Sequence, residues 1–287
     1  MSITIAADFA CGCAERPTWH PQEETLYFTD VDNPAVYAYH PASGQARQVY
    51  HGPDIVGGMT LHEDGRLLFF MAGGAIRLFH PESQRMETLL EGIEAEQNSR
   101  FNDVIADPKG RVFGGTMPTE DRPGRLYRFD PDGTLHTVLD RAGLPNGMGF
   151  SPDLKTFYFT DTQARTVERF DYDLESGALS NRRPLIHCAD EPGNPDGLAV
   201  DRQGNLWSAF FGGHRLVSYS PEGKEIERVD LPMAENPTCP LLVGEGTLYL
   251  TTAGGPHRPQ AGEAAGALLR TAVSARPGPI FRSGRTR

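Results

Sequence analysis

The chain has 287 residues, of which 38% are apolar, an ordinary content for a soluble globular protein and enough for one large domain or two small ones. Its formal net charge of −11 disfavours binding to nucleic acid and to anionic membrane surfaces, because no cluster of lysines and arginines offsets it. No apolar run reaches the ~18 residues of a membrane span and the amino-terminal residues lack a secretory pattern, so we expect a soluble, cytoplasmic protein.

The four cysteines do not form a recognisable metal or disulfide pattern. The only close pair, Cys11 and Cys13, is spaced more tightly than the cysteines of a zinc knuckle, and Cys188 and Cys239 lie far away in the sequence. In the expected reducing compartment they are predicted to be free thiols.

One sequence frame recurs six times along the chain. Each copy has a loop, an apolar strand, a polar turn and a second apolar strand, often followed by a third strand that ends in a Pro- and Gly-containing turn. The second strands begin at Thr25, Arg66, Arg111, Thr156, Asn205 and Thr247. A repeat of roughly 40–50 residues built from four strands predicts an all-β fold, a six-bladed β-propeller with four-stranded blades. A β-sandwich or two small barrels would not explain a constant period.

The two ends of the chain have separate predicted roles. The β-prone segment "SITIAADFA", residues 2–10, is expected to add the outer strand of the last blade, which closes the ring and protects its edges. We therefore predict a single propeller domain over residues 1–275. Residues 276–287 form a basic, turn-rich C-terminal tail for which we expect partial disorder.

In a propeller, equivalent residues of the innermost strands meet at the mouth of the central channel. Aligning the copies on the residue that opens each first turn, and stepping back five positions, gives a column of Glu15, Gly57, Asn102, Asn146, Asp196 and Thr238. Two carboxylates that face each other raise each other's pKa unless a cation lies between them. Carboxylate, amide and hydroxyl oxygens suit a hard divalent cation, so the column predicts a metal site.

Local turn chemistry is the alternative explanation for part of this column. Asn146 in "PNG" and Asp196 in "PDG" are typical turn residues, and a turn also accounts for Gly197. It does not account for Glu15, which precedes Arg and Pro, or for Asn102 in "SRFND". We therefore favour the metal site.

Several segments between about Ala14 and Gly255 are jointly specific. They read "ERPTWHPQEETLYFTDV", "NSRFNDVIADPKGRVFGGTM", "LPNGMGFSPDLKTFYFTDT", "FDYDLESGALSNRR" and "NPDGLAVDRQGNLW". In this order they resemble the senescence-marker-protein/gluconolactonase/regucalcin-like family, six-bladed propellers that bind one divalent metal and hydrolyse sugar lactones.

The resemblance implies roles for particular residues of this chain. The metal ligands would be Glu15, Asn146 and Asp196, and the substrate contacts would be Arg100, Asn102 and Glu120 of "GTMPTE". Two segments depart from the family: Arg16 stands where the family usually has Gly between Glu and Pro, and "LLVGEG" replaces Phe-Gly-Gly in the last blade.

The predicted function is metal-dependent hydrolysis of a sugar lactone, of the gluconolactone or pentonolactone type, to the aldonic acid. One divalent cation, Ca, Zn, Mg, Mn or Fe(II), would polarise the carbonyl or activate a water, with Asp196 as general base. Arg100 and Asn102 would orient hydroxyls or stabilise the oxyanion. The absence of a Gly-x-Ser-x-Gly elbow and of a Walker loop disfavours serine hydrolases and nucleotide enzymes.

Two alternatives share the same metal site. One is a phosphotriesterase-like hydrolase, and the other is a non-catalytic propeller scaffold in which the metal only stabilises the blades. The sequence leaves open the sugar, the metal and the oligomeric state.

Overall fold

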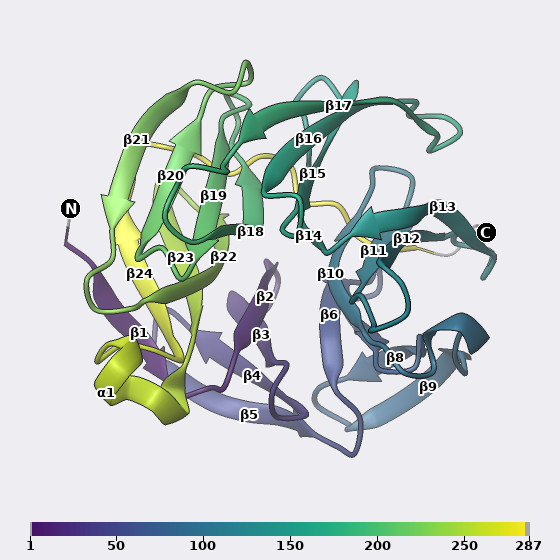
Figure 1. The fold of residues 1–287 in the computed structure, drawn as a ribbon. Coiled ribbons are helices and arrows are strands. Elements are labelled where there is room, and N and C mark those ends of the chain that lie inside the picture. Colours follow the sequence, from purple (N-terminus) through teal and green to yellow (C-terminus); the bar gives the residue numbers. More distant parts are fainter. Residues whose placement is uncertain (1, 285–287) are drawn as a thin grey trace.

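The computed structural model describes residues 2–284, which form a ring of six antiparallel four-stranded sheets around a central channel (Figure 1). This confirms the six-bladed β-propeller predicted from the repeat. No helix among these residues has the length and apolar character needed to cross a membrane. All four cysteines are free.

The first three blades use the strands between Ala14 and Gly143 in chain order, innermost strand first. Blade 1 contains β2 (Ala14–His20), β3 (Thr25–Asp30), β4 (Ala35–His40) and β5 (Gln45–His51). Blade 2 contains β6 (Val56–Leu61), β7 (Leu67–Met71), β8 (Ile76–His80) and β9 (Arg85–Leu90). After the short 3₁₀ helix η1 (Glu94–Glu96), blade 3 contains β10 (Phe101–Ala106), β11 (Val112–Thr116), β12 (Gly124–Phe129) and β13 (Leu135–Gly143).

The last three blades repeat this order. Blade 4 contains β14 (Pro145–Phe150), β15 (Thr156–Asp161), β16 (Thr166–Tyr172) and β17 (Leu179–His187). Blade 5 contains β18 (Asn194–Val200), β19 (Leu206–Phe211), β20 (Arg215–Tyr219) and β21 (Glu225–Asp230). Blade 6 contains β22 (Asn236–Val243), β23 (Thr247–Ala253), β24 (Ala267–Ala272) and β1 (Thr4–Asp8), with η2 (Gly255–His257) and α1 (Arg258–Ala261) inserted after β23.

The N-terminal strand closes the ring. β1 pairs antiparallel with β24, from Thr4 opposite Arg270 to Asp8 opposite Ala267. The outer strand of blade 6 therefore comes from the other end of the chain, as the β-prone segment at residues 2–10 predicted.

Apolar side chains fill the spaces between neighbouring blades. Blades 2 and 3 share one such cluster, in which the rings of Phe70 and Phe101 meet edge to face with their centroids 5.0 Å apart. Both side chains are almost completely buried, and burial of a Phe contributes roughly 1.5–3 kcal/mol. The outermost strands, such as β5, are largely exposed, so the core lies in the inner part of the ring.

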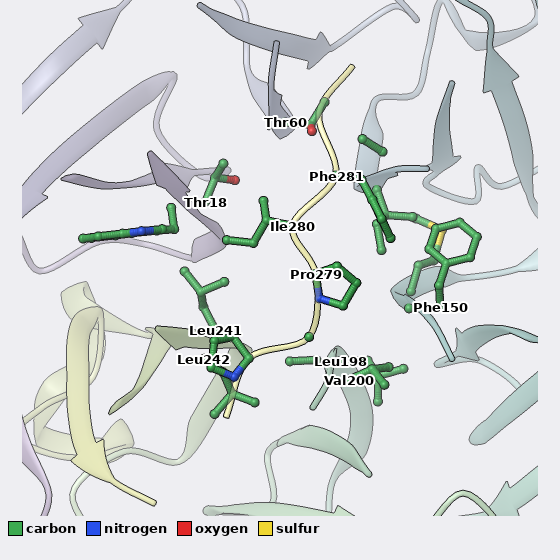
Figure 2. Close-up of a pocket in the computed structure, with 18 of the residues that line it drawn as sticks. Thr18, Thr60, Phe150, Leu198, Val200, Leu241, Leu242, Pro279, Ile280 and Phe281 are labelled. Carbon is green, nitrogen blue, oxygen red and sulfur yellow. The ribbon is translucent and has the colours of Figure 1, made fainter. Parts of the chain in front are cut away.

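The C-terminal tail crosses the channel at the end where the innermost strands finish (Figure 2). Its backbone pairs with blade 5 near Asp201 and with blade 2 near His62, and the ring of Phe281 lies 6.0 Å from that of Phe150. Between the tail and the strands is a mainly apolar cavity of about 150 Å³. The tail residues after Gly284 lie outside the described part of the chain.

Candidate metal and active site

The column residues lie at irregularities of the innermost strands. In every blade the register between the innermost strand and its neighbour shifts at the column position: Glu15/Thr18, Val56/Gly58, Phe101/Val104, Pro145/Met148, Pro195/Leu198 and Pro237/Pro240. A bulge leaves a residue unpaired and redirects its side chain. The column is therefore inside the strands, and Asp196 is the third residue of β18.

The glycines that follow the column residues allow the innermost strands of neighbouring blades to pack closely. A Cβ on Gly197 would lie 2.6 Å from backbone atoms of β22, and one on Gly147 would lie 2.3 Å from backbone of β18. Gly197 is not among the glycines with positive φ, so the turn explanation given for it from the sequence is wrong. Gly57 is more restricted still, since its Cβ would lie 1.7 Å from a carbonyl oxygen of β10, and this column position therefore excludes a side chain.

At four of the six blade junctions a side chain donates a hydrogen bond to the carbonyl that precedes a column residue. The bonds are Thr29 Oγ1 to Val56 O (2.6 Å), Asn102 Nδ2 to Pro145 O (2.9 Å), Thr162 Oγ1 to Pro195 O (2.6 Å) and Thr238 Oγ1 to Ala14 O (2.6 Å). They hold the innermost strands in place beside the channel mouth. The hydroxyl of Thr238 is therefore used in the contact between blades 6 and 1. It is not a free oxygen ligand for a cation in the channel, as the column had suggested.

Asn146 is oriented by one of these junction residues. Its Nδ2 donates to Thr162 Oγ1 at 3.2 Å, and the same hydroxyl donates onward to Pro195 O. With its amide nitrogen used in this way, Asn146 has its carbonyl oxygen available as a donor atom for a cation. Sequence reasoning missed Thr162, because nothing in its spacing marks it as a partner of Asn146.

Asp196 is a buried carboxylate with an unsatisfied oxygen. The residue is 4% exposed, and its Oδ1 has no hydrogen-bond partner among the described residues. Burial raises the pKa of Asp196 well above its usual range, and the charges of Glu15 and Asp103 raise it further. Leaving such a group unpaired costs free energy, so each instance in a folded protein needs a physical reason.

Glu15 has the same electrostatic character. Burial raises its pKa to about 8, the charge of Asp103 adds to this rise, and the backbone N–H of Arg16, 3.2 Å from Oε2, opposes it. Glu15 and Asp196 thus repel each other in a desolvated place, which is the condition that a bound cation would relieve. Perturbed carboxyl groups of this kind concentrate at functional sites.

The donor atoms present fit a hard divalent cation. Within residues 2–284 no three His, Cys, Asp or Glu side chains are grouped to hold a metal, so a site here requires the amide oxygen of Asn146 beside the two carboxylates. Two carboxylates and an amide oxygen are the ligand types of calcium- and magnesium-like ions, whose remaining positions water can fill. The unpaired Oδ1 of Asp196 is consistent with such a ligand.

Arg100 and Asn102 are brought together beside these carboxylates. Arg100 Nη1 donates to Asn102 Oδ1 at 2.8 Å and to Phe101 O at 3.0 Å. Burial lowers the pKa of Arg100, an effect that nearby negative groups including Glu15 and Asp196 oppose. Because Asn102 also donates to the next blade, both ends of its amide are in use, and it orients Arg100.

Glu120 is not part of the hydrogen-bond network of Arg100 and Asn102. It lies in the loop after β11, and its side chain is exposed. The structure gives it no hydrogen bond or ion pair with Arg100 or Asn102, so its predicted contact with substrate stays a prediction.

Asp103 and Arg16 form a buried ion pair next to the predicted ligands. Arg16 Nε lies 3.0 Å from Asp103 Oδ1, and the two side chains are 15% and 6% exposed. Arg16 has φ +47°, in the left-handed region that suits glycine, which is the residue the related motif has at this position. Asp103 belongs to the motif "RFND", but the sequence assigned it no role. Its pairing with Arg16 of blade 1 becomes apparent only when the ring of blades is closed.

Comparisons with known proteins agree with this architecture. The sequence profile of the SMP-30/Gluconolactonase/LRE-like region matches residues 13–254. The chain is 42% identical to Pentonolactonase XacC of Haloferax volcanii, covering 99% of this chain and 98% of that protein. It is 34% identical to Regucalcin of Xenopus laevis, covering 78% of this chain and 77% of the relative.

Solved structures extend the likeness to the fold. A luciferin-regenerating enzyme superposes with a TM-score of 0.87 at 25% identity, covering 100% of both chains. The family profile spans most of the chain and includes all three predicted metal ligands. The chain therefore belongs to the SMP-30/gluconolactonase/LRE-like family.

Proposed function

We propose that this protein hydrolyses a sugar lactone, of the gluconolactone or pentonolactone type, to the aldonic acid with the help of one divalent cation held by Glu15, Asn146 and Asp196. The observation that carries the proposal is the unpaired Oδ1 of the buried Asp196 beside the desolvated, partly buried Glu15. The named activity of the Haloferax volcanii relative, which matches nearly the whole chain, supports the substrate class.

A divalent cation supplies Lewis acidity in such a site, by polarising a carbonyl or lowering the pKa of a water. Glu15 and Asn146 would fix its place, since Asn146 is itself held by Thr162. Oxygen-only donors favour hard cations such as calcium, magnesium or manganese, and zinc and iron(II) remain within the range to be assayed.

Asp196 is the proposed general base. Water attacks the lactone carbonyl carbon while the carboxylate of Asp196 accepts a proton from that water. Collapse of the resulting oxyanion breaks the ring C–O bond, and the departing ring oxygen takes the proton that Asp196 accepted, which leaves a hydroxyl group on the aldonic acid and restores the carboxylate.

Arg100 is the proposed electrostatic partner of the oxyanion. Its guanidinium is held by Asn102 and by the Phe101 carbonyl, so it is pre-oriented before the substrate arrives. Fixed donors of this kind favour the transition state over the ground state because they need no reorganisation when charge develops.

The test is acid release from gluconolactone and a pentonolactone by protein treated with a chelator and then supplied with each cation in turn. We expect little hydrolysis by the chelated protein and recovery with at least one cation. Equal rates before and after chelation would refute the metal-dependent mechanism. Turnover of an organophosphate but of no lactone would favour the phosphotriesterase alternative.

A further inference from the structure

Arg16 contacts two of the three desolvated carboxylates at the channel mouth. Its backbone N–H lies 3.2 Å from Glu15 Oε2, and its Nε lies 3.0 Å from Asp103 Oδ1. Its backbone lies in the left-handed region, at φ +47°. Glycine adopts this conformation at no steric cost, whereas arginine is disfavoured in it. Backbone geometry therefore gives no reason for an arginine here, and the reason must lie in its charged side chain.

The charges near the site show what that side chain contributes. Glu15, Asp103 and Asp196 supply three carboxylates, and Arg16 and Arg100 supply two guanidinium groups within the same electrostatic environment. Asp103 Oδ2 has no hydrogen-bond partner among the described residues, and Arg16 is the ion-pair partner that the structure gives this carboxylate. A buried carboxylate without a counter-charge is strongly unfavourable.

We propose that Arg16 is a positioning residue that sets the charge of the cation site: by neutralising Asp103 it keeps a third negative charge from adding to those of Glu15 and Asp196. This inference rests on the proposed function, since it requires a cation at those two carboxylates. Arg16 follows Glu15 directly in the sequence and also lines the mainly apolar cavity beside the tail.

The experiment compares a divalent with a trivalent ion of similar size. The dissociation constants of Ca²⁺ and Tb³⁺ are measured by calorimetry on the full chain, for the wild type and for Arg16→Gly, which suits the left-handed backbone. Without the guanidinium the charge of Asp103 is uncompensated, so the affinity ratio should shift toward Tb³⁺ by about tenfold or more, the effect of one nearby unit charge at a partly buried site.

Two further variants separate charge from shape. Arg16→Lys keeps the charge and should leave the ratio within about threefold of the wild type, and combining Arg16→Gly with Asp103→Asn removes both charges and should restore it. Asp103→Asn alone leaves Arg16 uncompensated and should shift the ratio toward Ca²⁺. This last variant tests the inference even if Arg16→Gly fails to fold.

A purely structural role for Arg16 would weaken both ions alike and leave the ratio unchanged in Arg16→Gly and in Asp103→Asn, which would overturn the inference while the proposed function stands. If the wild type bound neither Ca²⁺ nor Tb³⁺, the inference about Arg16 would be overturned, and the chelation assay with the other cations would still decide the proposed function.

Discussion

Replacing Asp196 with Asn removes one of two desolvated carboxylates that repel each other, while it keeps the shape of the side chain. Asp196 is 4% exposed, and its Oδ1 has no hydrogen-bond partner within residues 2–284. An unsatisfied buried polar atom costs about 1–3 kcal/mol and more when charged. We therefore expect Asp196→Asn to raise the free energy of unfolding of the chelated protein by about 1–3 kcal/mol at pH 8.

The pH dependence of this gain follows from the direction of the pKa shift. The pKa of Asp196 is raised in the folded state above its ordinary value of 3.8. The carboxyl group therefore contributes most to stability below that value, and its contribution is lost as pH rises toward the folded pKa. The difference between variant and wild type should vanish near pH 4 and grow with rising pH.

Melting in the presence of a chelator measures the stability, and acid release from a lactone measures the activity. In a chain of this size, each kcal/mol of added stability raises the melting temperature by roughly 2–4 °C. Loss of a general base should lower kcat by about 10²–10⁴. The variant should therefore be more stable and nearly inactive.

Asp201 is the matched control in the same blade. It is also buried, but it accepts hydrogen bonds from the backbone of Gln203 and Asn205 and from Trp207 Nε1. Asp201→Asn should lower the melting temperature without a specific loss of kcat. If Asp196→Asn instead melted below the wild type and kept its activity, the site would be a structural scaffold and the reasoning would be refuted.

Five further outcomes follow from other parts of the structure. Since the pKa of Glu15 is raised from 4.5 to about 8, the stability of the chelated protein should fall as pH rises through this range, and the stabilisation by added Ca²⁺ should grow; a pH-independent gain would contradict this. Thr162→Val frees the amide of Asn146 and should weaken Ca²⁺ binding about tenfold in calorimetry. Thr29→Val removes the equivalent junction bond without touching a predicted ligand, so it should lower the melting temperature alone; equal effects of both variants on Ca²⁺ would contradict the assignment. Deleting residues 276–287 exposes the apolar side chains against which the tail packs, and it should lower the melting temperature by about 5 °C while lactone hydrolysis persists. A large loss of kcat would show instead that the far end of the channel matters for catalysis. Arg100→Gln should lower kcat/KM by about 10²–10³ in a lactone assay, and an unchanged value would exclude its role at the oxyanion.

The fold was predictable because the repeat is a local property. Each blade carries its own alternation of apolar strands and turns, so the period alone predicts the number of blades and the closing strand. Counting back from the turns also placed Glu15, Asn146 and Asp196 at equivalent positions, and each lies at a strand irregularity beside the channel.

Contacts between blades were not predictable, since they depend on strands that are distant in the sequence. The turn explanation of Gly197 failed because its lack of a side chain is required by β22 of the next blade. The same limit hid the contact of Thr162 with Asn146 and the pairing of Arg16 with Asp103, which joins blades 1 and 3.

The most direct measurement of the central account is a stoichiometric titration of the chelated protein with a single divalent cation while lactone hydrolysis is followed. We predict that activity rises linearly, saturates at about one cation per chain and does not recover in Asp196→Asn. Full activity without added cation, or an equal recovery in Asp196→Asn, would contradict a catalytic cation held by Glu15, Asn146 and Asp196.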